Sequence, residues 1–183
     1  MRKRNSELSH PAGGYGSGFF EWIHIFFVAV VVAGLVGVCL FQIVRIEQIS
    51  MEPTFYHGDK VVVARSVYWF DEPKSGDIVV FSSDDGEYNY IKRVIGVPGD
   101  EILIEDGVVY RNGKALLEPY ISEATEGSFF IKVQDGEFFC MGDNRNSSID
   151  SRHDAIGCIA KRDILGKVVY SIAPWGRVEQ YGH

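Results

Sequence analysis

The chain has 183 residues, a formal net charge of −7 and a sequence pI of about 5.2. This length allows one compact domain with an attached segment, and the acidic balance argues against a nucleic-acid partner, which normally requires a basic face. A mean hydropathy of −0.01 averages a very apolar segment with an ordinary polar one.

The N-terminal part is predicted to be a tail followed by a membrane span. Residues 1–18 are polar and glycine-rich, which is typical of disorder. Residues 19–44 are predicted to form a transmembrane helix, because no charged residue occurs between Trp22 and Val44. The uncharged stretch from Trp22 to Val44 alone would make a helix of ~35 Å, against a hydrocarbon core of ~30 Å. A cleaved signal peptide is the alternative, but the apolar run is too long and no A-x-A site follows it.

The orientation of this span is predicted from its basic flanks. Arg2, Lys3 and Arg4 precede the span, and Arg45 alone follows it closely. Basic residues concentrate on the cytoplasmic side of membrane proteins. We therefore expect a cytoplasmic N-terminus and an extracytoplasmic domain over residues 45–183.

Residues 45–183 are predicted to form an all-β, mostly antiparallel domain. Helical periodicity is nearly absent, and short β-rich runs follow one another instead. Three turn pairs, Asp106-Gly107, Asn112-Gly113 and Asp135-Gly136, are strong hairpin signals. The predicted strands are Lys60–Ala64, Asp77–Phe81, Tyr88–Val97, Glu101–Glu105, Val108–Arg111, Phe129–Val133, Glu137–Met141 and Lys167–Ile172.

The sequence contains no motif that is typical of a metal-binding or nucleotide-binding site. The five histidines are scattered, and neither a C-x-x-C, an H-E-x-x-H nor a phosphate-binding G-x-x-x-x-G-K-[ST] pattern is present. We therefore predict no metal and no cofactor. Cys140 and Cys158 fall in the exported part, where a disulfide is permitted, but the sequence leaves open whether they meet.

The stretch "ISMEPTFYHGDKVVVAR" places Ser50 just after the apolar segment, either as a nucleophile or as a turn residue. A serine nucleophile needs a base. One candidate is His57 or His153, with Asp59 or Asp154 as its orienting acid. The other is Lys92, which lies in the apolar run "YIKRVIGVPGD", where desolvation favours a neutral amine. Taken alone, Lys92 is more simply a solvent-exposed strand residue.

A third stretch, "GDNRNSSIDSR" (Gly142 to Arg152), concentrates polar side chains in eleven residues. It is either a solvated loop or a hydrogen-bonded scaffold behind an active site. In the second case ion pairs are expected to fix the loop, and a serine hydroxyl from it is expected to hold the lysine amine. The charged residues involved are Asp143, Arg145, Asp150 and Arg152.

Together, the three stretches resemble the ordered boxes of type I signal peptidases, the membrane-bound Ser/Lys proteases of bacteria, and "IAKRDILGKVVYSIAPW" resembles the C-terminal strand region of that family. The resemblance implies a nucleophile at Ser50, a general base at Lys92 and a lysine-orienting hydroxyl at Ser148. It implies structural roles for the four charged residues of the third stretch. It also implies that the N–H of Ser50 serves the oxyanion hole. Relatives usually carry serine or glycine at the position of Gln48, which makes Gln48 a candidate second donor.

The resemblance further implies a substrate and a location. The substrates are preproteins with small residues at the −1 and −3 positions, bound as an added strand along Val44–Gln48 and Asn89–Ile91. Cleavage takes place at the lipid bilayer of the bacterial cytoplasmic membrane, with the secretion translocon as a further candidate partner. Apolar pockets for the small side chains are assigned to Ile46, Met51 and Ile91, and the strands add Val44 and Tyr90 to the binding residues.

Two rival functions remain for such a chain. A self-cleaving Ser/Lys repressor-type protease is expected to carry a DNA-binding domain in place of the apolar segment. A non-catalytic, membrane-anchored β module that binds extracytoplasmic peptides is expected to lack the nucleophile or the base. Ser50, Lys92 and Ser148 are all present in this chain.

Overall fold

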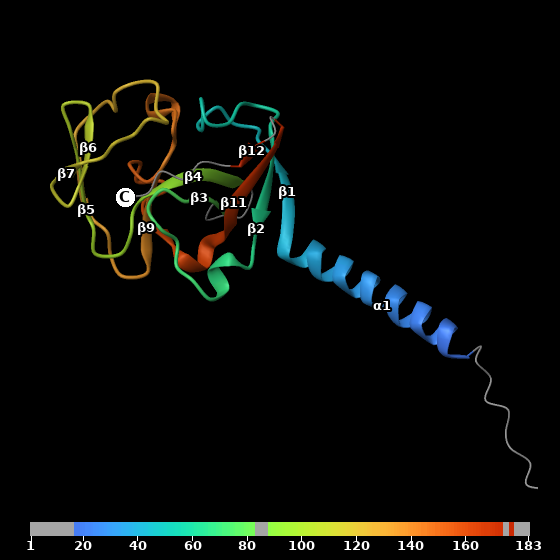
Figure 1. Cartoon of the computed structure of the whole chain (residues 1–183). Helices are drawn as coiled ribbons and strands as arrows, with labels where there is room; N and C mark the ends of the chain where they lie inside the picture. The colour runs from blue at the N-terminus through green and yellow to red at the C-terminus, as the bar shows by residue number, and fades with distance from the viewer. Residues whose placement is uncertain (1–16, 83–87, 174–175, 178–183) are drawn as a thin grey trace, which may run out of the picture. The chain divides into compact units, whose positions relative to one another are not determined.

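The computed structural model of the chain describes residues 17–82, 88–173 and 176–177. It separates into two compact units, Met1–Val38 and Cys39–His183. The basic residues at positions 2–4 and most of the predicted tail lie outside the described residues. The elements are α1 Ser17–Leu40, β1 Phe41–Arg45, β2 Lys60–Ala64, η1 Val67–Trp69, β3 Ile78–Ser82, β4 Asn89–Gly96, β5 Glu101–Glu105, β6 Val108–Arg111, β7 Lys114–Ala115, β8 Phe129–Lys132, β9 Glu137–Met141, η2 Arg145–Ser147, β10 Ile159–Ala160, η3 Lys161–Asp163, β11 Ile164–Ala173 and β12 Gly176–Arg177 (Figure 1).

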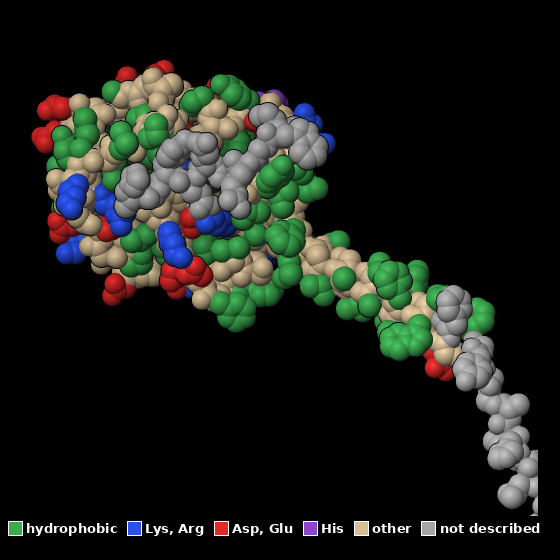
Figure 2. Space-filling view, viewed as in Figure 1, with side chains coloured by type: hydrophobic (Ala, Val, Ile, Leu, Met, Phe, Trp, Pro, Cys, Tyr) green, Lys and Arg blue, Asp and Glu red, His purple; other side chains and the backbone are tan. Residues whose placement is uncertain are grey.

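The apolar segment forms helix α1, whose stretch from Phe20 to Leu40 is long and apolar enough to cross a membrane. Its described side chains are almost all exposed, and Figure 2 shows hydrophobic side chains along its length. The helix ends at Leu40, four residues before the predicted Val44. Phe41–Arg45 instead forms β1, which pairs with β2. Hydropathy alone did not locate this end, because Ile43 and Val44 are as apolar as the helix but are also good strand formers.

The second unit is built from two antiparallel sheets, as predicted for the domain. The larger sheet has the strand order β1-β2-β11-β3-β4-β9-β10, with β12 paired to β11, and the smaller has the order β7-β6-β5-β8. In Figure 1, β5, β6 and β7 lie at one end of this unit, β1, β2 and β11 lie at the other, and β4 lies between them. Four strands were not predicted, namely β1, β7, β10 and β12, and the last three have two residues each, which is too short for a polar–apolar alternation to show.

Both faces of the larger sheet are covered by apolar side chains. Along β3, Ile78 and Val80 belong to one core cluster, while Val79 and Phe81 belong to another. This two-sided burial explains why β3 is continuously apolar instead of alternating. A third cluster joins the two sheets, with Ile95 and Met141 from the larger sheet and residues such as Ile102 from the smaller.

Two of the three predicted hairpins are present in the smaller sheet. Asp106-Gly107 joins β5 to β6, and Asn112-Gly113 joins β6 to β7, with positive φ at all four residues. These are the backbone angles that a two-residue type I′ turn requires. The hairpin prediction at Asp135-Gly136 was wrong. A turn forms there, but β8 before it pairs with β5, while β9 after it pairs with β4 and β10.

Cys140 and Cys158, the two cysteines that the sequence left as a possible pair, are free thiols. Cys140 is fully buried on β9 with the cluster around Val94 and Phe138, whereas Cys158 packs against the cluster that joins the sheets. Burial raises the pKa of the Cys158 thiol to about 11 and that of Cys140 further still. The question that the sequence left open is therefore answered by two separate thiols, of which Cys140 is buried and Cys158 is partly buried.

Candidate active site

Ser50 lies in a tight loop between β1 and β2. The loop is closed by hydrogen bonds from the Ile46 N–H to the Asp59 carbonyl and from the Gly58 N–H to the Ile46 carbonyl. Met51 and Phe55 point into the core beneath it. The turn therefore has an apolar anchor that fixes the backbone on which Ser50 sits. Ser50 itself is 6% exposed.

Lys92 lies opposite Ser50, although 42 residues separate the two in sequence. Its Nζ is 2.6 Å from Ser50 Oγ, and this buried hydrogen bond is the one that the Ser50 hydroxyl makes within the described residues. The side chain of Lys92 leaves strand β4 and is only 1% exposed. The exposed-lysine interpretation of the sequence is thus wrong, because β4 is covered on both faces.

Burial lowers the pKa of Lys92 to about 8. Desolvation of the ammonium group is the largest cause. Asp150 and Asp143 oppose this shift, but each of these carboxylates is itself held by an arginine. The amine thus has acidic neighbours but forms no ion pair with any residue that the structure describes. At pH 7, roughly 10% of an amine with such a pKa is neutral, compared with about 0.03% of an ordinary lysine.

The Gly142–Arg152 loop is fixed by buried ion pairs, and two of them involve residues outside it. Asp150 pairs with Arg152 inside the loop, with an Nε–Oδ1 distance of 2.8 Å. Asp143 instead accepts two hydrogen bonds from Arg93, at 2.8 and 2.7 Å, and one from the Thr54 hydroxyl. Arg145 pairs with Glu118, which lies between β7 and β8. The expected ion pairs are therefore present, but only one connects two residues of the loop.

The loop also holds the nucleophile's backbone. The N–H of Asn144 donates to the Ser50 carbonyl at 3.0 Å, and its side-chain amide donates to the Ile49 carbonyl at 3.2 Å. Gly142 comes so close that an added Cβ would lie 2.4 Å from the Ser50 carbonyl oxygen and 2.3 Å from Ser148 Oγ. Only glycine fits at this position without displacing one of them.

Ser148 lies beside this contact but does not make the hydrogen bond that the resemblance implied. The residue is 7% exposed, and its Oγ makes no hydrogen bond of normal geometry within the described residues, although it lies close enough to Asp150 to act on that carboxylate. Lys92 Nζ bonds to Ser50 instead. A buried hydroxyl without a hydrogen-bond partner is uncommon. Rotation of the Ser148 side chain about its Cα–Cβ bond is the simplest way for its hydroxyl to gain a partner.

A groove of about 270 Å³ borders Ser50. It runs between the Val44–Gln48 segment and the start of β4, with Ile46, Met51 and Ile91 as buried apolar lining. Of the predicted substrate-binding residues, only Tyr90 is absent from its lining. Tyr90 stacks on Phe81 and faces Lys92, whose Nζ lies 5.7 Å from the centre of its ring.

Gln48 is a half-buried residue of this groove. Its side chain makes no hydrogen bond to another described residue, and neither does the Ser50 N–H. Two donors beside the nucleophile are thus unused. The predicted binding strand at Val44–Gln48 is regular only as far as Arg45, where β1 ends.

The two histidine alternatives do not reach Ser50. His57 is exposed, and its Nδ1 lies 3.1 Å from the Glu47 carbonyl oxygen. His153 is also exposed and begins the segment that follows the Gly142–Arg152 loop. Between the histidines and Lys92, the geometry favours the lysine.

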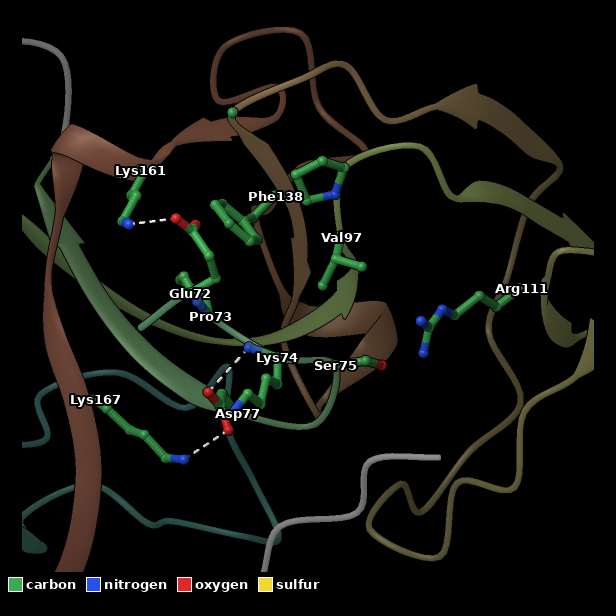
Figure 3. Close-up of a pocket in the computed structure, with 12 residues that line it drawn as sticks. Glu72, Pro73, Lys74, Ser75, Asp77, Val97, Arg111, Phe138, Lys161 and Lys167 are labelled. Atoms are coloured by element: carbon green, nitrogen blue, oxygen red, sulfur yellow. Dashed lines mark hydrogen bonds and ion pairs between the residues drawn. The ribbon is translucent and has the colours of Figure 1, made fainter. Parts of the chain in front are cut away.

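A second, larger cavity of about 930 Å³ contains none of the predicted site residues (Figure 3). Its charged groups neutralise one another. Lys167 Nζ lies 2.7 Å from Asp77 Oδ1, and Lys161 pairs with Glu72, as the dashed lines show. The larger hollow is therefore a region of satisfied ion pairs, while the smaller groove borders Ser50, the residue that Lys92 contacts.

Comparison with known proteins matches this arrangement to a family. The profile of the family described as signal peptidase, peptidase S26, matches residues 19–173. The chain belongs to this family. Signal peptidase I of Bacillus licheniformis is 36% identical over 175 residues, covering 90% of this chain and 94% of its own length. Signal peptidase I T of Bacillus subtilis strain 168 is 33% identical over 189 residues, covering 97% of each. A crystal structure of a signal peptidase I from Enterococcus faecalis V583 aligns with 54% of this chain and 98% of its own, at 28% identity and a TM-score of 0.49.

Several residues that support the site of this signal peptidase family member were missed by the sequence analysis. Thr54 and Arg93 hold Asp143, and Glu118 holds Arg145. Tyr120 lies between the two arginines, with its ring centre 3.9 Å from the Arg93 guanidinium carbon and 5.9 Å from that of Arg145. Of these residues, only Arg93 could have been found from the sequence. It is a second cation next to Lys92 in an apolar run, and a buried arginine needs an acidic partner.

Proposed function

We propose that this chain is a membrane-anchored serine endopeptidase that removes signal peptides from exported preproteins, with Ser50 and Lys92 as a catalytic dyad. The observation that carries the proposal is the buried 2.6 Å contact between Lys92 Nζ and Ser50 Oγ. A weak hydroxyl nucleophile needs an adjacent base, and Lys92 is the one titratable group that the described structure places in contact with it. Membership of the signal peptidase family supplies the substrate class.

In this mechanism the neutral amine of Lys92 takes the Ser50 proton as Oγ attacks the scissile carbonyl. The resulting ammonium then protonates the leaving amine, and a water molecule resolves the acyl-enzyme by the reverse proton transfers. The two arginine–aspartate pairs have a clear role here. Arg93 holds Asp143, and Arg152 holds Asp150. Neither carboxylate is therefore free to pair with the Lys92 ammonium and stabilise its protonated form.

The oxyanion that forms during the attack is assigned to two donors. The Ser50 N–H is one, since it is unused and belongs to the nucleophile itself. The amide of Gln48 is the second, since it lines the same groove and makes no hydrogen bond to a described residue. A donor aimed at developing charge contributes far more to the rate than to ground-state binding.

The substrate is assigned to the groove as an added β-strand. Strand β9 pairs with β4 only from Arg93 onward, which leaves the Asn89–Ile91 edge unpaired by β9. A peptide strand here would satisfy these backbone groups, which is the usual form of β-augmentation. Ile46, Met51 and Ile91 form the buried apolar floor, so short side chains at −1 and −3 fit best.

The location follows from helix α1 and the substrate class. We assign the chain to the bacterial cytoplasmic membrane, with its N-terminus in the cytoplasm and its β domain outside. Signal segments are themselves apolar, so anchoring both enzyme and substrate in one bilayer raises their effective concentration. The secretion translocon is a further candidate partner.

The test is cleavage of a peptide with an A-x-A site by the detergent-solubilised full chain. The parent should cut after the second alanine, and Ser50→Ala should not cut. His57→Ala is the matched control, because that exposed imidazole should leave the rate nearly unchanged. A parent that binds the peptide without cutting it would favour the non-catalytic β module, and retained cleavage in Ser50→Ala would remove the nucleophile assignment.

A further inference from the structure

Residues 116–128, which connect β7 to β8 of the smaller sheet, form a segment without a helix or strand. The backbone of this segment is nevertheless held near each end. The N–H of Leu116 donates to the Val109 carbonyl at 2.8 Å, and the N–H of Thr125 donates to the Gly107 carbonyl at 3.1 Å. None of these residues lines the groove of the candidate active site. Any effect of the segment on catalysis must therefore pass through other side chains.

Tyr120, from this segment, packs its ring against Arg93. The ring centre lies 3.9 Å from the guanidinium carbon, and both residues are buried. A guanidinium over an aromatic face is attracted by the ring electrons, most strongly where water is excluded. The edge of the same guanidinium is also occupied. Its Nε and Nη2 donate to Asp143, and its Nη1 donates to the Gly76 carbonyl at 3.2 Å. The hydrogen bonds hold the guanidinium at its edge, and the Tyr120 ring covers its face.

The Tyr120 ring is itself fixed by a second buried cluster. Its hydroxyl donates to Glu118 at 2.8 Å, and Glu118 also accepts a hydrogen bond from Arg145 Nη1 at 2.9 Å. Arg145 donates further to the Thr125 hydroxyl at 2.9 Å and to the Gly142 carbonyl at 3.1 Å. The segment thus holds one arginine through a carboxylate and a hydroxyl, and the other through an aromatic ring.

Asp143 connects Arg93 to the turn that bears Ser50. Its carboxylate accepts a hydrogen bond from the hydroxyl of Thr54, which follows Ser50 by four residues in that turn. The next residue, Asn144, donates its N–H to the Ser50 carbonyl at 3.0 Å. A shift of the Arg93 guanidinium would therefore move the backbone on which Ser50 lies. Small displacements of a reacting group cost much of its rate.

We propose that Tyr120 is a positioning residue of this site, which acts by holding the Arg93 guanidinium against Asp143. Asp143 in turn fixes the turn that bears Ser50. This inference rests on the proposed function, in which Ser50 is the nucleophile. It gives the smaller sheet a role in catalysis, which is to hold residues 116–128 against two buried arginines. Because the segment does not line the groove, loss of the ring should lower the rate of the chemical step and leave substrate binding unchanged.

The test compares Tyr120→Leu with Tyr68→Leu in the detergent-solubilised full chain. Tyr68 is a matched control, because it is also 8% exposed and its hydroxyl also donates to a carboxylate at 2.8 Å, that of Asp77. No cation–π contact of Tyr68 occurs within the described residues. For the A-x-A peptide, Tyr120→Leu should lower kcat roughly three- to thirtyfold and change KM less than about twofold. Tyr68→Leu should lower kcat less than about threefold.

Two further substitutions at this position separate the ring from the hydroxyl. Tyr120→Phe keeps the face toward Arg93 and loses the bond to Glu118, so its kcat should stay within about threefold of the parent. Tyr120→Met fills more of the space than leucine does and has no ring. It takes the place of Tyr120→Leu if that variant does not fold.

A second readout does not need catalysis. The Arg93 Nε–H is buried and donates to Asp143 at 2.8 Å, so its hydrogen exchange should be slow in the parent. Its NMR signal is assigned by its loss in Arg93→Lys. At temperatures equally far below the Tm of each variant, Tyr120→Leu should speed this exchange at least about tenfold relative to Tyr68→Leu and Tyr120→Phe.

Several results would overturn the proposal. One is a loss of kcat in Tyr120→Leu no larger than that in Tyr68→Leu. Another is a fall in kcat without faster exchange at Arg93, and a third is faster exchange without a fall in kcat. An equal loss in Tyr120→Phe would assign the effect to the hydroxyl instead of the ring. If the parent cuts no peptide, the proposed function fails, and the exchange comparison alone decides whether Tyr120 positions Arg93.

Discussion

Lys92 and Lys167 occupy the same row of the larger sheet. Both lie directly opposite Val79 on β3, Lys92 from β4 and Lys167 from β11. Lys167 Nζ lies 2.7 Å from Asp77 and borders the larger cavity, whereas Lys92 Nζ lies 2.6 Å from a neutral hydroxyl. The difference lies in the partner. Lys167 has a carboxylate as its partner, whereas the acidic neighbours of Lys92 are held by arginines and burial lowers the pKa of Lys92 to about 8.

The two hollows beside these lysines differ in the same way. The larger one is lined by charges that pair with one another. The smaller one borders Ser50, whose hydroxyl contacts Lys92, and Gln48, whose amide makes no hydrogen bond to a described residue. Volume alone would have selected the larger cavity, which contains none of the proposed site residues. Functional sites are better recognised by polar groups that the fold leaves ready to act.

The largest effect is expected when Lys92 is replaced, and replacement of Lys167 is the control. Lys92→Ala and Lys92→Arg should both lower kcat/KM for the A-x-A peptide by at least ~10²–10⁴, the contribution of a general base, because arginine does not deprotonate. Lys167→Ala should retain activity within about threefold. Steady-state kinetics on folded, detergent-solubilised variants gives the answer. Activity in Lys92→Ala that disappears on replacing His57 or His153 would transfer the base to a histidine.

A slightly smaller effect is expected at the unused donor of the groove. Gln48→Ala should cut kcat by ~10²–10³ with little change in KM, because one donor to the oxyanion is lost only in the transition state. Gln48→Ser should restore part of that loss, since a hydroxyl is also a donor. An alanine variant with the parent's kcat would leave the Ser50 N–H and other backbone groups as the only donors.

The pH dependence tests the difference in partners directly. Since the active form of Lys92 is the neutral amine and burial lowers its pKa to about 8, kcat/KM should rise ~10-fold per pH unit below that value. It should level off above it. A pH titration of peptide cleavage by the parent measures this. A rate that keeps rising to pH 10 would mean that Lys92 titrates as an ordinary lysine.

The smallest effect on catalysis is expected at the paired lysine. Asp77→Asn removes the charge opposite Lys167 and weakens the hydrogen bonds from Tyr68 and from the Lys74 N–H. It should lower the free energy of unfolding by about 1–3 kcal/mol, since the pair is largely buried, and should change kcat less than twofold. Thermal unfolding in detergent, with Asp71→Asn on the exposed pair as control, measures the difference. A large loss of kcat without a loss of stability would give the larger cavity a catalytic role.

Features that depend only on residues close together in the sequence could be predicted from the sequence itself. The apolar run predicted helix α1, because a membrane span is defined by composition and length. Asp106-Gly107 and Asn112-Gly113 predicted two hairpins, because positive φ at adjacent positions selects a tight turn. The ordered motifs around Ser50, Lys92 and Gly142 identified the family, and their resemblance named both members of the proposed dyad.

The tertiary structure decided what those motifs do to one another. The contact between Ser50 and Lys92, the pairing of Arg93 with Asp143 and the close approach of Gly142 to the Ser50 carbonyl all join segments more than 40 residues apart. Strand order brings them together, and strand order has no local signal. The same reason explains the turn at Asp135-Gly136, where identical turn chemistry joins strands of two different sheets. Strand order also explains the difference between the two lysines that lie opposite Val79. Within the described residues, Lys167 forms an ion pair with Asp77, whereas Lys92 contacts the Ser50 hydroxyl instead of a carboxylate.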